Sequence, residues 1–163
     1  MDSILEKRIN KLDDFQLLRF FNYLGQSLFE GIEASSEELK NGIPHPVKAI
    51  NEINKIDKLP KHAFEAELSS KEAIAFARIT LLNWANDDTL SHLVEHALNS
   101  YKDDELVAET ILAFGFAASM ILLTATTGVK IKIGNMTIEK KAASVEMVKA
   151  IVESLSNVIS KLI

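Results

Sequence analysis

Cysteine is absent from this chain of 163 residues. Its absence excludes a disulfide scaffold, a zinc site built from thiolates and a cysteine nucleophile. The first residues, MDSILEKRINKLDD, also lack the basic segment and following apolar run of a secretory signal, so we expect no such signal. Both observations suit a reducing compartment, and we predict a cytoplasmic protein, with membrane association as the alternative.

Proline is scarce as well, and its three residues all fall between positions 44 and 60. Because proline lacks an amide donor and forces its predecessor into extended geometry, the Pro44-His45-Pro46 segment predicts a loop. No segment has the length and composition of a linker between two domains. The apolar content of 47% is enough for one core, so we predict a single helical domain, 1–163.

Basic residues are too few to balance the acidic ones, and the net charge is −5. The imbalance lies before residue 130, where the chain carries −8, whereas residues 130–163 carry +3. Binding to nucleic acid depends on Lys and Arg side chains that neutralise phosphates. We therefore do not expect nucleic acid to be a partner.

Catalytic motifs are nearly absent: the sequence has no phosphate-cradling glycine loop, nucleophile elbow or paired-carboxylate motif. One segment, His92-Leu93-Val94-Glu95-His96, resembles the H-x-x-E-H pattern of inverzincins. The resemblance implies that His92 and His96 bind zinc and that Glu95 acts as the base for a bound water. It covers five residues, and no second motif supplies a third ligand. We therefore interpret these side chains as the solvated face of a helix, and predict no cofactor.

Residues 110–129, TILAFGFAASMILLTATTGV, contain no charged side chain. A helix of this length spans about 30 Å, enough to cross a bilayer or to form the centre of a soluble bundle. Small residues such as Gly115 and Ala117 favour close approach of neighbouring helices. Lys130 and Lys132 follow the stretch, as basic residues often flank a membrane span. We favour the soluble bundle and keep a membrane span at 110–129 as the alternative.

Helix signals occupy most of the remaining chain. Ser3 with Glu6 and Ser69 with Glu72 have the spacing of capping boxes. Another segment, after Asp13, carries apolar residues at steps of three and four, which draw one stripe along a helix: Leu17, Phe21, Leu24, Leu28 and Ile32. These signals predict a bundle of six or seven helices around a central, buried helix at about 104–127.

A different period begins after the uncharged stretch. Residues 129–140 alternate apolar and polar side chains on either side of Gly134-Asn135, which predicts a β-hairpin with a two-residue turn. Its apolar face comprises Ile131, Ile133, Met136 and Ile138. Because an isolated hairpin is marginal in water, this face must lie against helices or a second protomer, and the outer strands expose unpaired backbone groups.

A terminal helix is expected to begin after Ser144 and to carry apolar residues at coiled-coil spacing, including Val148, Val152, Leu155 and Ile159. Two uses of the hairpin and this helix remain open. They either form a twofold dimer or complete the core of their own chain.

Our overall prediction is a mainly α domain with one hairpin before the C-terminal helix. Its predicted role is non-enzymatic: an interaction or regulatory module that binds a protein partner or a second copy through the hairpin and last helix. A membrane-associated protein is the second hypothesis and a zinc-dependent hydrolase the third. The sequence contains no pattern that identifies a small-molecule ligand.

Overall fold

The computed structural model describes residues 3–30, 32–33, 66–102, 112, 114–125, 129–140 and 143–158. Within these ranges it confirms a mainly helical fold with a β-hairpin before the C-terminal helix. The loop expected at Pro44-His45-Pro46 and the site residue Ile159 lie outside the described residues. The elements are α1 (Ile4–Asn10), α2 (Asp14–Glu30), β1 (Ile32–Glu33), α5 (Ser70–Trp84), α6 (Leu90–Ser100), α7 (Phe114–Ala125), β2 (Val129–Ile133), β3 (Met136–Lys140) and α8 (Val145–Glu153).

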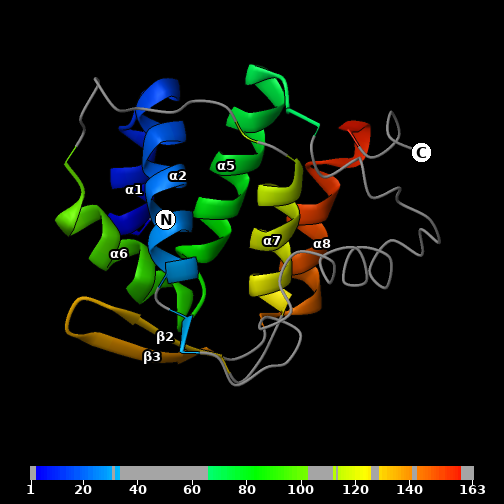
Figure 1. Ribbon diagram of the computed structural model, residues 1–163. Coiled ribbons are helices and arrows are strands. Elements are labelled where there is room, and N and C mark those ends of the chain that lie inside the picture. Colours follow the sequence, from blue (N-terminus) through cyan, green and yellow to red (C-terminus); the bar gives the residue numbers. More distant parts are fainter. Residues whose placement is uncertain are drawn as a thin grey trace.

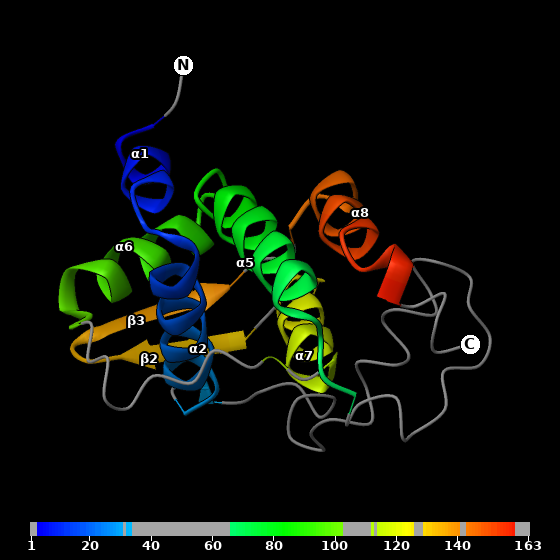
Figure 2. The same ribbon diagram turned by 90° about the horizontal axis from the view of Figure 1, so that it is seen from above.

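Four helices, α2, α5, α7 and α8, stand side by side in Figure 1, and the strands lie across one end of them. Helices α1 and α6 cover the side of the bundle opposite α8 (Figure 2). Helix α2 packs mainly against α5, whereas α8 packs against both α5 and α7. The core therefore runs through the bundle from α1 and α6 at one side to α8 at the other.

Helices α1 and α5 begin at the serine caps expected from the sequence, whereas the cap of α2 is not among those expected. Ser69 and Glu72 form the complete capping box of α5, and the Ser3 hydroxyl accepts the Glu6 amide at the start of α1. Asp13 and Gln16 cap α2 reciprocally, because each side chain accepts the backbone amide of the other. These local bonds satisfy first-turn amides that have no partner inside a helix.

Helix α7 is buried on all sides that the structure describes. Phe114 and Leu123 are nine residues apart, which places them on opposite sides of a helix with 3.6 residues per turn, and both are fully buried. Of its described side chains, only that of Phe116 is partly exposed. The helix begins later than 104, since Leu112 precedes it and its carbonyl accepts the Leu68 amide. Among the described residues, no helix is both long and apolar enough to cross a membrane.

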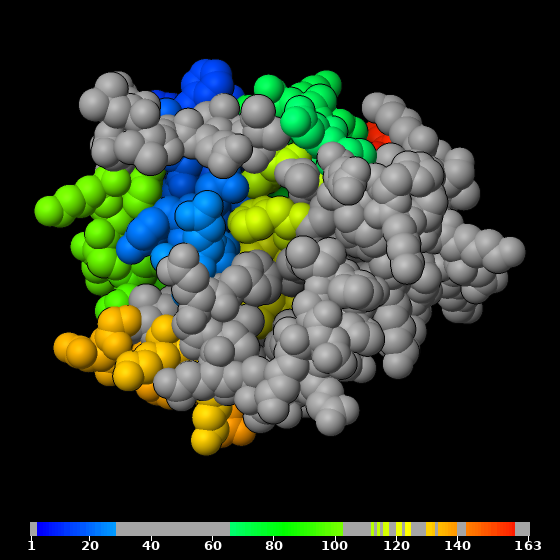
Figure 3. Space-filling model, viewed as in Figure 1, coloured from blue at the N-terminus to red at the C-terminus, as the bar shows by residue number. Residues whose placement is uncertain are grey.

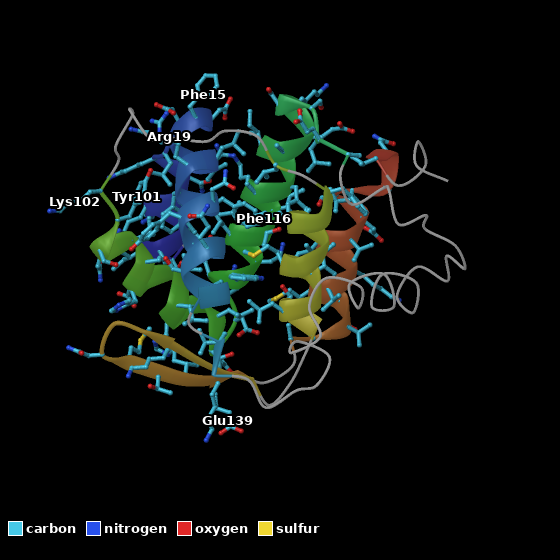
Figure 4. The ribbon with its side chains drawn as sticks, in the orientation of Figure 1. Phe15, Arg19, Tyr101, Lys102, Phe116 and Glu139 are labelled. Carbon is cyan, nitrogen blue, oxygen red and sulfur yellow. The ribbon has the colours of Figure 1, made fainter. Side chains whose placement is uncertain are left out.

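Helices α2 and α7 approach closely at Gly25. A Cβ atom at this position would overlap the ring of Phe116, which lies between the two helices in Figure 4. Phe116 in turn contacts Phe21 edge to face at 5.6 Å, and Phe21 contacts Phe76 of α5 at 5.7 Å. Three helices thus meet in one aromatic cluster, whose geometry requires a residue without a side chain on α2.

The hairpin has the register that the sequence predicts. Ile131 pairs with Ile138, Lys132 with Thr137, and Ile133 with Met136. Gly134 takes a φ of 58° in the turn, a conformation that glycine adopts without strain.

One strand was not expected. Ile32 was assigned to the apolar stripe of α2, but the helix ends at Glu30 and Ile32 belongs to β1, which pairs antiparallel with β2. The sheet therefore has the order β1-β2-β3, and one of the two edges predicted to be open is covered. Two residues are too few to display an alternating pattern, so the sequence contains no signal for this strand.

A buried hydrogen bond joins α5 to α7. The indole Nε1–H of Trp84 donates to the Thr124 hydroxyl at 2.9 Å, and that hydroxyl donates to the Met120 carbonyl at 2.7 Å. A second buried hydroxyl, that of Thr80 on α5, has no hydrogen-bond partner among the described residues. The two threonines thus have opposite expected effects on stability.

Replacing Thr124 by valine keeps its shape but leaves the Trp84 indole without its acceptor. We expect Thr124→Val to lower the free energy of unfolding by about 1–3 kcal/mol. The matched control is Thr80→Val, which removes an unpartnered hydroxyl and should leave stability unchanged or raised by up to about 1 kcal/mol. Urea unfolding measures both, and equal losses in the two variants would contradict the proposed role of the Trp84–Thr124 bond.

The close approach at Gly25 leads to a second prediction about stability. Gly25→Ala improves helix propensity by about 1 kcal/mol, but the added methyl overlaps the Phe116 ring, so we expect a net loss of about 1–3 kcal/mol. In a Phe116→Leu background the same substitution should cost less, because the obstructing ring is gone. A double-mutant cycle from urea unfolding measures this coupling, and additive losses would show that Phe116 does not constrain Gly25.

Candidate functional site

The inner face of the hairpin lies against the helices. Ile131 is fully buried, and Met136 and Ile138 are partly buried against the core. The polar residues of the other face, Lys130, Lys132, Thr137 and Glu139, are all exposed. Figure 4 shows Glu139 pointing away from the helices. The predicted division into an apolar and a polar face is therefore confirmed for these side chains; that of Ile133 is not described.

The predicted interaction face of the last helix packs inside its own chain. Val148 is buried, and Val152 and Leu155 are fully buried within the common core. Helix α8 ends at Glu153, and Ser154 is its C-cap. The Ser154 hydroxyl donates to the Ile151 carbonyl. Helix α8 packs against α5 and α7, as in the second use left open above, and these three side chains are buried inside their own chain.

The outer edge of β3 is a different kind of surface. Within the described ranges, β3 pairs with β2 on one side and with no strand on the other. The hairpin forms part of the molecular surface at the lower left of Figure 3, below α6. A strand edge of this kind presents backbone donors and acceptors that another strand can pair with.

Residues of opposite charge are paired in the register of the sheet. Glu33 of β1 is opposite Lys130 of β2, and Lys130 is opposite Glu139 of β3. Opposite charges in directly facing positions stabilise a sheet modestly. The row ends with an acidic residue at the free edge, so a strand that adds there meets a negative charge at this position.

The histidine motif lies on α6, close to the hairpin. His92 and Glu95 are exposed, whereas His96 is partly buried and its Nε2 would lie 3.4 Å from a Cβ at Gly134. The imidazole therefore packs beside the turn. Among the described residues, no group of three His, Cys, Asp or Glu side chains is arranged to hold a metal ion.

A pocket of about 310 Å³ opens where α1, α2 and the end of α6 meet. Sequence reasoning did not find it, because its residues come from separate helices and look individually like ordinary surface or core positions. Tyr101, the C-cap of α6, lies beside α1 and α2 in Figure 4. Its ring contacts Phe20 edge to face and Tyr23 at a tilted angle. The lining residues are Arg8, Lys11, Leu12, Gln16, Leu98 and Tyr101.

Comparisons of the chain with protein-family models, curated proteins and solved structures gave no match. The function must therefore be argued from the geometry of the chain itself.

The position of the histidine pair leads to an expectation about zinc. With two imidazoles and no arranged third ligand among the described residues, we expect 100 µM Zn²⁺ to shift the melting temperature by less than about 1 °C. Differential scanning fluorimetry of the wild type and of His96→Gln measures the effect. A saturable rise in the wild type that His96→Gln abolishes would restore the zinc hypothesis.

Proposed function

We propose that this protein is a non-enzymatic interaction module that associates with a second copy of itself through the outer edge of β3. The observation that carries the proposal is the arrangement of the sheet. Strand β1 pairs with the outer edge of β2, whereas the outer edge of β3 pairs with no described strand. Addition of a strand to such an edge is a recurrent mode of protein recognition. The second copy is the partner argued here because it brings the same edge in a self-complementary form.

The edge offers specific backbone groups. In an antiparallel pair, hydrogen-bonded residue pairs alternate with pairs that are not hydrogen-bonded to each other. The pair Ile133–Met136 closes the two-residue turn and is hydrogen-bonded, so Ile138 also directs its amide and carbonyl toward β2. Thr137 and Glu139 then direct theirs toward the free edge.

The register of a twofold pair follows from the length of β3. All five residues overlap only when Ile138, the centre of the strand, lies on the twofold axis. Thr137 then faces Glu139 of the second copy on both sides of the axis, and the exposed backbone groups pair in full. A shifted register, in which Glu139 faces Glu139 of the second copy, would bring two carboxylates together, which is unfavourable.

Apolar contact adds to this arrangement. Ile138 is only partly buried in the single chain, so two copies of its side chain would meet beside the axis on the inner face. The contact comprises one short strand from each copy, which is small compared with the interface of a stable dimer. We therefore propose a weak, concentration-dependent association, which suits assembly controlled by the local concentration of the protein.

The test is a proline at the edge. Thr137→Pro removes an amide that points away from β2, so it should abolish strand addition while the hairpin ladder remains. The matched control, Thr137→Val, keeps the amide and a β-branched side chain. Sedimentation velocity from about 5 to 500 µM should show a rising dimer fraction for the wild type and for Thr137→Val, and a monomer for Thr137→Pro.

Hydrogen exchange provides a measurement that needs no variant. In the single chain the Thr137 and Glu139 amides have no strand partner among the described residues, so we expect them to exchange fast. In the dimer they become hydrogen-bonded, so their protection should increase with protein concentration while that of Ile138 changes little. A wild type that stays monomeric to 500 µM, or a Thr137→Pro variant that dimerises like the wild type, would overturn the proposal.

A further inference from the structure

We infer that the pocket between α1, α2 and α6 is a binding site for a small carboxylic acid with an apolar body. The inference is independent of self-association, because the pocket and the β3 edge involve different residues. It rests on three properties of the pocket: two cationic side chains that pair with no acidic side chain among the described residues, an apolar and aromatic wall, and a volume suited to a small molecule.

Arg8 and Lys11 supply the positive charge. They lie three residues apart, at the end of α1 and at its C-cap, and both line the pocket. Neither forms an ion pair with any acidic side chain that the structure describes.

Three acidic residues, on α1 and at the start of α2, have other partners. Glu6 accepts the side-chain amide of Asn86 at 2.6 Å, and Asp14 pairs with Arg78 at 3.4 Å. Asp13 accepts the backbone amide of Gln16 at 2.8 Å as the cap of α2. None of these three carboxylates lines the pocket, so among the described residues Arg8 and Lys11 remain available to an anion from outside.

Gln16 adds a neutral donor. Its side-chain oxygen accepts the Asp13 amide at 3.0 Å, and its Nε2 forms no hydrogen bond with the described residues. An Arg guanidinium pairs with both oxygens of a carboxylate, and an ammonium and an amide group complete such a site. The three polar side chains thus provide donors only, as an anionic group requires.

The apolar and aromatic residues of the pocket wall determine which chemical group is attached to the anion. Leu12 and Leu98 present apolar surface, and the Tyr101 ring is held by aromatic contacts with Phe20 at 5.5 Å and Tyr23 at 5.1 Å between ring centres. A fixed ring is a suitable surface for an apolar or aromatic group. With about 310 Å³, the pocket lies at the lower end of the range for small-molecule sites, which suits a small acid.

The test compares a probe acid with its neutral analogue. In ¹H–¹⁵N spectra of the full chain, 4-phenylbutyrate should shift the amides of Lys11, Gln16 and Leu98 in a saturable way. The neutral 4-phenylbutyramide has the same apolar body without the charge, and we expect it to bind about fivefold more weakly. Added salt should weaken the binding of the acid more than that of the amide.

Variants locate the charge requirement. Arg8→Gln and Lys11→Gln should each weaken the binding of 4-phenylbutyrate by about fivefold. Lys149→Gln is the matched control, because Lys149 is an exposed cation on α8, at the other side of the molecule. Melting curves of all variants check the fold, which these exposed or partly exposed positions should leave intact.

Three results would overturn the inference. The first is that no saturable shift occurs up to about 20 mM probe, beyond which affinity would be too weak for a specific site. The second is equal affinity for the acid and the amide, which would show apolar adsorption only. The third is an equal effect of Lys149→Gln and Arg8→Gln, which would show a general response to charge.

Discussion

The fold depends on the enclosure of α7. A helix without charges has no face suited to water, and its described side chains are buried on opposite sides. It therefore needs neighbours around it, which the amphipathic α2, α5 and α8 provide. The close approach at Gly25 and the bond between Trp84 and Thr124 determine how two of these neighbours meet it.

This requirement also explains the use of the C-terminal helix. Val148, Val152 and Leu155 have the spacing of a dimer interface, but the uncharged helix lies beside them in the same chain. Contact within the chain carries no cost of lost translational freedom, so it takes precedence over contact between copies. Among the described residues, the outer backbone edge of β3 stays unpaired.

The candidate sites lie at separate places on the bundle. The β3 edge lies at the end where the sheet crosses the helices, and the pocket lies where α1 and α6 cover α2. Neither depends on residues of the core. The two proposals, strand pairing and anion binding, therefore involve different residues and can be tested independently.

Much of the fold could be predicted because its signals are local. The Gly134-Asn135 turn and the alternating residues beside it are adjacent in sequence, and the hairpin register follows from them alone. The caps at Ser69, Asp13 and Ser144 act within three residues. Hydrophobic periodicity likewise identified the buried face of α2, except for Ile32.

Other features depend on residues that are distant along the chain. The pairing of Ile32 with Ile131, the bond from Trp84 to Thr124 and the pocket formed by Arg8, Gln16 and Leu98 have no local pattern. Periodicity showed that the last helix has an apolar face, but only packing decided which surface covers it. Local hydrogen bonding and amphipathicity thus determine the elements, whereas the competition for burial among distant segments decides which surfaces remain for function.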